Sequence, residues 1–393
     1  MYLFRFLEKE LELLKESSLY RQLPGPLEEF NGSRAIINGQ EVLLFSSNNY
    51  LGMSHHPRVK AATLEAVERW GTGSGGSRLT TGNFVLHRQL EERIARFKST
   101  EDAIVFSSGY LANLGVISAL VGQGDLVLSD ELNHASIIDG CRLSRATVKV
   151  FRHKDVAHLK DILLAERNSY RRCLIVTDGV FSMDGDIAPL PQLLQLAEEF
   201  QSLLMVDDAH ATGVLGKRGA GTVEHFGLEN KNIIQVGTLS KALGSEGGYV
   251  AGNVILIDYL RNRARSFIFS TALSPPIVAA AIAALDVLEE ELYLLDQLHA
   301  NVRQFYKGLK ELGFEVLPTE SAIIPLMVGE SHRTLALSSA LAEKGVFVPA
   351  IRPPTVPEGT SRLRITVMAT HKPEDIQRAL EAFLWAGKRV GLI

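Results

Sequence analysis

An aspartate, a histidine and a lysine stand where two apolar runs of strand length end. Asp207 and His210 follow the run 203–206, and Lys241 follows the run 233–236, at a separation of 241 − 207 = 34 residues from Asp207. If both runs are strands of one parallel sheet, the three side chains meet at its carboxyl edge, where open α/β sheets bind their ligands. The spacing therefore predicts a site that combines a carboxylate, an imidazole and an amine.

These three groups together can hold and activate a flat cationic ring. A carboxylate that follows an apolar strand is costly to bury unless a cation faces it, and a protonated pyridine nitrogen is such a cation. A desolvated amine close to that ring loses its proton more easily and can form a Schiff base. We therefore predict the cofactor pyridoxal 5′-phosphate, with Lys241 as its Schiff-base lysine, Asp207 on the pyridine nitrogen and His210 on the phenolic oxygen.

Two plainer interpretations of Asp207 and His210 stay open on the sequence alone. Aspartate is an ordinary helix cap, so the two residues could stand at a helix start without touching any ligand. They could also be two ligands of a metal site, but no third ligand stands nearby in the sequence. We predict that the protein holds no metal.

The neighbours of Lys241 distinguish it from a solvated surface lysine. Thr238 and Ser240 provide hydroxyl groups suited to a phosphate, and four glycines allow the backbone to approach a ligand closely. These glycines are Gly237, Gly244, Gly247 and Gly248.

A second phosphate contact is predicted where the apolar run 103–106 leads directly into a helix. Free amide groups and the helix dipole bind phosphate at a helix start, which favours Ser108, Gly109 and Tyr110 as the phosphate site. A serine that only caps the helix is an equally acceptable interpretation.

Two more polar residues follow apolar runs and are expected at the same edge of the sheet. His134 stands in the stretch 132–136 and could stack on the ring, and Ser182 in the stretch 178–186 offers a hydroxyl group. A lone histidine is more often structural, and a serine in such a stretch can belong to an ordinary turn.

The run 71–76 has the G-x-G-x-x-G spacing of dinucleotide-binding folds, but it follows a predicted helix instead of a strand. The context that this motif needs is missing, so nicotinamide binding is not favoured. We interpret the run, with Ser77 and Arg78, as a flexible loop that faces the substrate.

The elements that must position these residues alternate between strands and helices from about residue 42 to residue 251. This alternation predicts an α/β fold in which helices cover both faces of a mostly parallel sheet. Strands are predicted at 103–106, 126–128, 148–151, 174–177, 203–206 and 233–236, and helices at 57–70, 84–97 and 189–200.

The pattern changes after Pro275 and Pro276, where a smaller α+β unit is expected to begin. Its predicted elements are a long helical stretch at 278–312, strands at 314–317, 323–327, 346–349 and 363–367, and helices at 335–343 and from 373. The chain opens with an amphipathic helix whose apolar residues are Leu3, Phe4, Leu7, Leu11 and Leu14. We predict an N-terminal helical arm (1–45), a large cofactor-binding domain (46–276) and a small C-terminal domain (277–393).

Composition argues against several classes of function. A net charge of −4 in 393 residues does not suggest a nucleic-acid partner, and no uncharged run reaches the roughly 18 residues of a membrane span. Cys141 and Cys173 have neither pairing nor metal spacing, which is typical of core residues in a reducing compartment. We expect a cytoplasmic enzyme with no nucleic-acid or membrane partner.

Five motifs resemble those of the α-oxoamine synthases, fold-type I pyridoxal-phosphate enzymes that join an amino acid to an acyl thioester with loss of carbon dioxide. The resemblance extends over nearly the whole chain, and its most specific parts are residues 46–52, 133–136, 178–186, 206–210 and 237–241. It implies a large domain with a mostly parallel central sheet, a smaller C-terminal domain, and a homodimer with shared active sites.

Within that family, two pairs of substrates fit the sequence. Runs 76–82 and 350–359 are similar to the member of the biotin pathway that condenses L-alanine with a pimeloyl thioester of CoA or of a carrier protein. Runs 137–140 and 386–391 are similar to the member that uses glycine and acetyl-CoA. The first pair is the prediction and the second is the alternative.

The resemblance also implies roles for single residues. It repeats those of Lys241, Asp207 and His210, and it stacks His134 on the ring, where this catalytic residue also meets the substrate. Further residues implied to bind the cofactor are Ser182 beside the phenolic oxygen, Thr238 on the phosphate, and Ser270 or Thr271 on the phosphate of the neighbouring subunit. Residues implied to bind substrate are Asn48 and Arg364 on the carboxylate, Thr355 on the acyl side and Arg21 on the acyl carboxylate.

Overall fold

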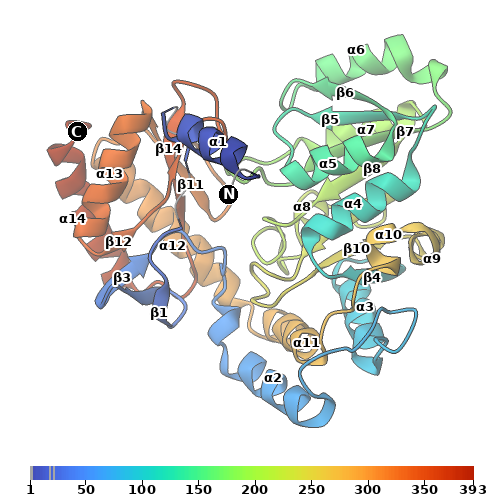
Figure 1. The fold of residues 1–393 in the computed structure, drawn as a ribbon, viewed down its shortest axis with the longest axis horizontal. Coiled ribbons are helices and arrows are strands. Elements are labelled where there is room, and N and C mark those ends of the chain that lie inside the picture. Colours follow the sequence, from blue (N-terminus) through green and yellow to red (C-terminus); the bar gives the residue numbers. More distant parts are fainter. Residues whose placement is uncertain (1–2, 17–18, 21–22) are drawn as a thin grey trace.

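Short apolar runs form a seven-stranded sheet at the centre of the larger of two units (Figure 1). The computed structural model describes residues 3–16, 19–20 and 23–393. The strands of this sheet are β4 (Asp102–Phe106), β5 (Leu126–Asp130), β6 (Thr147–Phe151), β7 (Cys173–Asp178), β8 (Leu203–Asp207), β9 (Ile233–Thr238) and β10 (Gly248–Gly252). Their order is β4-β10-β9-β8-β7-β5-β6, and every neighbouring pair from β9 to β6 is parallel.

The six strands predicted from the sequence are all present, each slightly longer than predicted, so the α/β fold with a mostly parallel sheet is confirmed. Strand β10, antiparallel to both of its neighbours, was not predicted, because glycine at both ends weakens the strand signal. Glycine is required there, since a Cβ on Gly248 would lie 2.5 Å from the Cα of Gly109 at the start of α4 (Gly109–Leu120).

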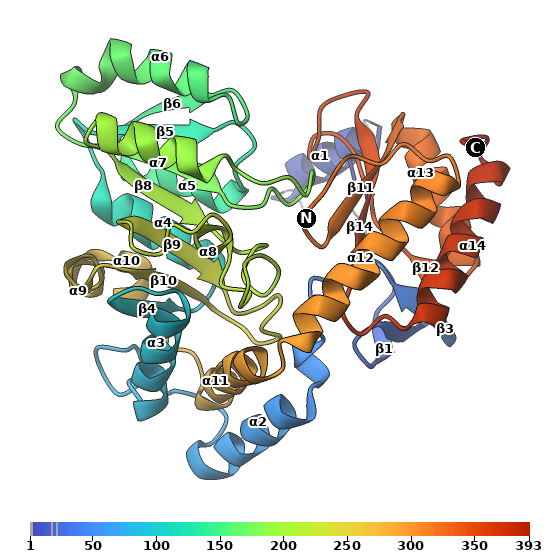
Figure 2. The same ribbon diagram turned by 180° about the vertical axis from the view of Figure 1, so that it is seen from behind.

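Helices cover both faces of the sheet (Figure 2). Successive residues of a strand point to opposite faces, and in β5 Val127 packs into one hydrophobic cluster while Leu126 and Leu128 pack into another. Because both faces are covered, polar side chains reach a ligand only from the strand ends. The Val127 face is covered by α4, α5 (Ala135–Ser144) and α9 (Val254–Arg263), and the other face by α6 (Val156–Glu166) and α7 (Leu190–Glu199).

The smaller unit contains a three-stranded sheet in the order β11-β14-β13, with helices packed on it (Figure 1). The predicted strand at 314–317 makes only one bridge, between Val316 and Leu326. The elements of this unit are β11 (Ile323–Gly329), β12 (Val346–Phe347), β13 (Ala350–Ile351), β14 (Ser361–Thr366), α12 (Tyr293–Glu311), α13 (Ser331–Glu343) and α14 (Pro373–Arg389).

The predicted helical stretch 278–312 is two helices, α11 (Pro275–Glu290) and α12. The chain turns between them because they pack on different partners. Helix α11 lies against α2 (Pro57–Trp70) and α3 (Val85–Phe97) in the larger unit, whereas α12 packs against α14. Both α2 and α3 were predicted.

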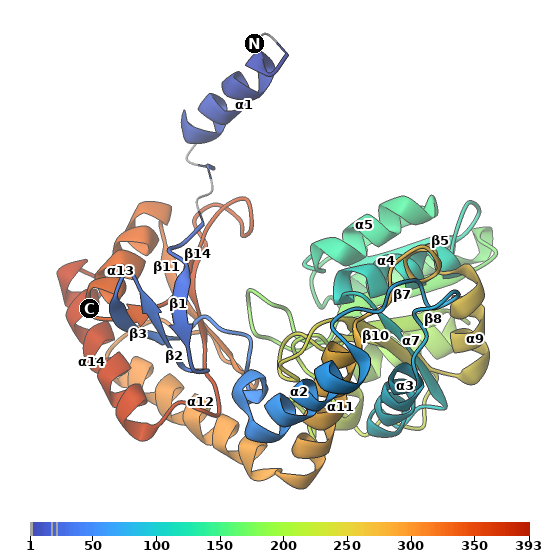
Figure 3. The same ribbon diagram turned by 60° about the horizontal axis from the view of Figure 1, so that its bottom comes forward.

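In the described part of the N-terminal arm the one helix is α1 (Arg5–Glu16), which has no buried residue and stands away from both units in Figure 3. It continues as the strands β1 (Leu27–Phe30), β2 (Arg34–Ile37) and β3 (Gln40–Leu44). Strand β3 pairs in parallel with β12, so residues 27–44 of the predicted helical arm join the smaller unit instead. The short remaining elements are η1 (Met53–His55), η2 (Arg167–Ser169), α8 (Thr222–His225) and α10 (Arg265–Ile268).

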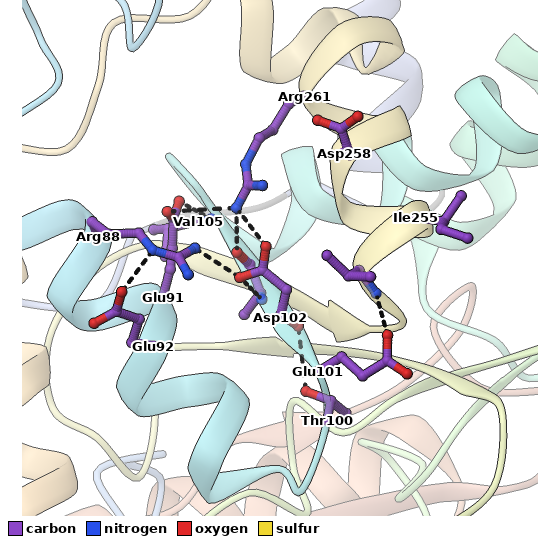
Figure 4. A network of polar contacts seen from close by, with 12 residues as sticks. Arg88, Glu91, Glu92, Thr100, Glu101, Asp102, Val105, Ile255, Asp258 and Arg261 are labelled. Atoms are coloured by element: carbon purple, nitrogen blue, oxygen red, sulfur yellow. Dashed lines mark hydrogen bonds and ion pairs between the residues drawn. The ribbon is translucent and has the colours of Figure 1, made fainter.

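Two arginines hold the start of β4, at the opposite end of the strand from Ser108 (Figure 4). Arg88 of α3 and Arg261 of α9 donate to the carboxylate of Asp102 over 2.8 and 2.9 Å. Burial by itself raises the pKa of Asp102, but hydrogen bonds from its neighbour's backbone and from both arginines lower it overall. These ion pairs tie α3 and α9 to the strand that leads into the site.

Lys98 and Asp208 form an ion pair with no solvent exposure beside the end of β8. Nζ of Lys98 lies 2.8 Å from Oδ2 of Asp208 and also donates to the carbonyl of Ala220 over 2.5 Å. The other carboxylate oxygen of Asp208 accepts from the backbone and the hydroxyl of Thr222. The pair fixes the residue that follows Asp207.

Replacing Lys98 with methionine is expected to lower the free energy of unfolding by about 3–5 kcal/mol, because the Asp208 charge stays buried without its cation. Urea unfolding of the full chain measures this loss. The double variant Lys98→Met/Asp208→Asn should recover part of it. A single variant as stable as the parent protein would contradict the expectation.

Candidate active site

Lys241 follows the end of β9 and points its amine at His210. Nζ lies 2.9 Å from Nε2 of His210. Burial lowers the pKa of Lys241 to about 8, against the raising effect of the charges of Asp207 and Asp178. The amine is therefore available in both its charged and its neutral form near neutral pH.

Asp207 is buried at the end of β8, where its carboxylate accepts two hydrogen bonds. Its Oδ2 accepts from Nδ2 of Asn113 over 2.6 Å, and its Oδ1 accepts from the amide of Ala209 over 2.9 Å. Within the described part of the chain, no lysine, arginine or histidine forms an ion pair with this carboxylate, in contrast to Asp208 beside it. The site therefore fits a cationic group opposite Asp207.

A row of hydrogen bonds connects Asp207 to His134. Asn113 donates to both Asp207 and Ser136, and the Ser136 hydroxyl lies 2.8 Å from Nδ1 of His134. The amide of His134 donates to Asp178 at the end of β7. Asn113 was not predicted from the sequence, although a single asparagine on the mostly apolar helix α4 was a usable signal.

His210 is connected on its other side to the smaller unit. Its Nδ1 lies 2.7 Å from the hydroxyl of Tyr50, which lies 3.1 Å from Oδ1 of Asn48. Arg364 of β14 donates to the same oxygen over 3.2 Å and also to the carbonyl of Ser182. The structure thus brings Asn48, Ser182 and Arg364 to one place, although they are far apart in the sequence.

The start of α4 lies next to the end of β9. Ser108 caps the helix, since its hydroxyl accepts from the amide of Leu111. Its role on the phosphate stays a prediction. A Cβ on Gly109 would lie 3.3 Å from the Cβ of Thr238, which brings the first amides of the helix close to that hydroxyl. Tyr110 meets the ring of His134 edge-on, at 6.5 Å between centroids.

Three predicted residues, Ser270, Thr271 and Thr355, are not in these contacts, and a fourth cannot be placed. Ser270 bonds to the hydroxyl of Ser107 over 2.9 Å, and Thr271 forms a bridge with Ser77. Thr355 is an exposed turn residue, and Arg21 lies outside the described residues. Their predicted roles involve a neighbouring subunit, its cofactor phosphate or the acyl substrate, so a single chain does not test them.

The described residues contain no group of three or more histidine, cysteine, aspartate or glutamate side chains that could hold a metal ion. Across the same residues, no helix combines the length and the apolar character that a membrane crossing requires.

His153 connects two loops that carry predicted site residues. Its Nδ1 and Nε2 each lie 2.9 Å from a carboxylate, of Asp130 before the His134 loop and of Asp186 after the Ser182 loop. Burial by itself lowers the pKa of His153, but hydrogen bonds to the two carboxylates outweigh this effect and raise it to about 9.

We expect the charged His153 to stabilise the fold by roughly 2–3 kcal/mol at pH 6. Since its pKa is raised on folding, this stability is fully present below the unfolded value near pH 6.5 and is lost as the pH rises through about 9. Urea unfolding of the parent protein and of His153→Gln should differ clearly at pH 6 and converge by about pH 10. A difference that does not depend on pH would contradict this account.

The chain matches a known protein family over most of its length. The model of the aminotransferase class I and II family matches residues 40–383. The chain belongs to this family. Its fold is accordingly that of the fold-type I pyridoxal-phosphate transferases, as the sequence predicted.

Three individual proteins refine this placement. The chain is 49% identical to the 8-amino-7-oxononanoate synthase of Thermoanaerobacter pseudethanolicus, over 99% of this chain and 98% of that protein. It superimposes with a TM-score of 0.93, at 37% identity over 99% and 98% of the two chains, on a lysine-to-alanine variant of S. paucimobilis serine palmitoyltransferase with a bound PLP–myriocin aldimine. A structure of the Francisella tularensis 8-amino-7-oxononanoate synthase matches with a TM-score of 0.76 and 31% identity, over 88% and 98%.

Proposed function

We propose that this protein is an 8-amino-7-oxononanoate synthase, which condenses L-alanine with a pimeloyl thioester, releases carbon dioxide and serves biotin biosynthesis. The observation that carries the proposal is the identity of about one half, over nearly the full length of both chains, to proteins of that name. Loss of carbon dioxide and formation of a carbon–carbon bond both require a carbanion at Cα, for which the site has to supply an electron sink.

The residues present fit pyridoxal 5′-phosphate. Asp207 is a buried carboxylate with no ion-pair partner among the described residues, which suits a protonated pyridine nitrogen. Lys241 is a half-buried amine with a lowered pKa. The first amides of α4 at Gly109 and Tyr110, with Ser108 and Thr238, would hold the phosphate. When bound, the cofactor accepts the electron pair of the Cα carbanion.

The remaining side chains bind and orient the substrate. Arg364 is buried and already faces Asn48, so the two can hold the alanine carboxylate and fix the direction of the bonds at Cα. Lys241, with a pKa of about 8, removes the Cα proton as the neutral amine and returns it as ammonium. His134 would stack on the ring, and His210 and Ser182 would hold its phenolic oxygen.

The proposal also includes assembly and location. We assign the enzyme to the cytoplasm and to a homodimer in which Ser270 or Thr271 reaches the phosphate of the other subunit. Thr355 and Arg21 would line the acyl side. These assignments follow from the resemblance to the α-oxoamine synthases.

Fold similarity alone does not choose the substrates, since serine palmitoyltransferase superimposes on this chain even better than the Francisella synthase does. A second candidate is 2-amino-3-ketobutyrate CoA ligase, which uses glycine and acetyl-CoA and which runs 137–140 and 386–391 favour.

Steady-state kinetics separate these candidates. Release of free CoA thiol is measured with pimeloyl-CoA, acetyl-CoA and palmitoyl-CoA, each combined with alanine, glycine and serine. We expect the highest kcat/KM for alanine with pimeloyl-CoA. A clear preference for glycine with acetyl-CoA would replace the assignment. No thiol release with any pair, or with a pimeloyl-carrier protein and alanine, would exclude the synthase reaction.

A further inference from the structure

Tyr50 is a fully buried residue of the site to which the proposed reaction gives no role. Its hydroxyl oxygen lies 2.7 Å from Nδ1 of His210 and 3.1 Å from Oδ1 of Asn48. Nε2 of the same imidazole lies 2.9 Å from Nζ of Lys241, and Arg364 donates to the Asn48 oxygen. One row of hydrogen bonds therefore runs from the carboxylate-binding residues to the lysine.

The number of protons available determines which group donates in each of these hydrogen bonds. A tyrosine hydroxyl has one proton, and the amide oxygen of Asn48 can only accept, so Tyr50 donates to Asn48. The Tyr50 oxygen then accepts a hydrogen bond from the Nδ1–H group of His210. The opposite arrangement would leave two oxygen atoms 3.1 Å apart with no proton between them.

The other imidazole nitrogen follows from this assignment. Burial, and after it the charge of Lys241, lower the pKa of His210 well below its usual value, so the ring is neutral. With its one proton on Nδ1, the ring presents a lone pair at Nε2. That lone pair faces the amine of Lys241 and accepts a hydrogen bond from its ammonium form.

We propose that, in the protein without its cofactor, Tyr50 is a positioning residue that holds the proton of His210 on Nδ1 and so directs the Nε2 lone pair at Lys241. The inference rests on the proposed function in one respect, the assignment of Lys241 as the cofactor lysine. The other charged or titratable groups that act on Lys241 are Asp207, Asp178, Arg364 and His134. The variant Tyr50→Phe leaves all four in place, and Arg364 is the one among them that also acts on the Tyr50 hydroxyl.

The variant Tyr50→Phe tests the inference in the full-length chain freed of cofactor. The rate of Schiff-base formation with pyridoxal phosphate is measured against pH, and its midpoint reports the pKa of Lys241. In the variant the Nδ1 proton has no acceptor, so the proton moves to Nε2 and the ammonium of Lys241 loses its partner. We expect the midpoint to fall by about one pH unit, as the loss of a hydrogen bond to a charged group implies.

Two further variants complete the test. Tyr249→Phe is the matched control, because this tyrosine is equally buried but bonds to Thr212 outside the row, and its midpoint should not change. Asn48→Ala removes the acceptor, so Tyr50 turns its proton to His210 and the midpoint should fall as in Tyr50→Phe. Pyridoxal phosphate has the same ionisable groups in every sample. The result is therefore the difference in pH midpoint between each variant and the parent protein.

The possible results distinguish a failure of the Tyr50 role from a failure of the proposed function. An unchanged midpoint in Tyr50→Phe, or an equal fall in Tyr249→Phe, would overturn the role of Tyr50. If Tyr50→Phe does not fold, Asn48→Ala decides alone, and an unchanged midpoint there overturns the inference. A parent chain that forms no Schiff base at Lys241 would instead contradict the proposed function.

Discussion

Replacing Lys241 with alanine is expected to lower kcat by about 10³-fold or more and to remove the absorbance near ~420 nm that a pyridoxal-phosphate Schiff base gives. The amine is the only described lysine nitrogen within hydrogen-bond reach of His210, and it lies at the carboxyl edge of the sheet beside Asp207. In the proposed reaction this amine both binds the cofactor and carries the Cα proton. Absorption spectra and thiol release measure the two effects.

An exposed lysine provides the control for this prediction. Lys217→Ala lies in the same unit and should leave the spectrum and kcat unchanged. Borohydride reduction of the parent protein followed by peptide mapping identifies the lysine that carries the cofactor. A labelled peptide that does not contain Lys241 would show that the site has been assigned to the wrong residue.

Replacing Asp207 with asparagine is expected to lower kcat by about 10²–10³-fold, because the charge that keeps the pyridine nitrogen protonated is lost. The side chain keeps its shape and can still accept from Ala209, so the fold should not change. Thiol release with alanine and pimeloyl-CoA gives the rate, and thermal unfolding checks the fold.

Asp207→Glu is the informative comparison. It restores the charge in a longer side chain, so it should recover part of the rate that Asp207→Asn loses. Equal rates in the asparagine variant and the parent protein would exclude Asp207 as the partner of a ring cation. In that case the hydrogen bonds to Asn113 and Ala209 would be its whole role.

Local pattern was enough to predict the sheet and the residues at its edge. Apolar runs of strand length predicted six strands, and the rule that parallel strands end at one edge placed Lys241, Asp207 and His210 at the same edge. Strand β10 did not follow from pattern, because its glycines serve a close approach to α4 that no local signal reports. The break between α11 and α12 was missed because two different packing partners determine it.

The sequence by itself predicted the kind of chemistry, from a lysine, an aspartate and a histidine that follow strands and from the motifs around them. Only the tertiary structure decided how these groups are connected. Asn113 ties Asp207 to His134, and Tyr50 ties His210 to Asn48 and Arg364, across separations of up to 316 residues. Strand ends follow from local hydrophobic periodicity, which a sequence displays, whereas hydrogen bonds between distant loops depend on how the two units pack.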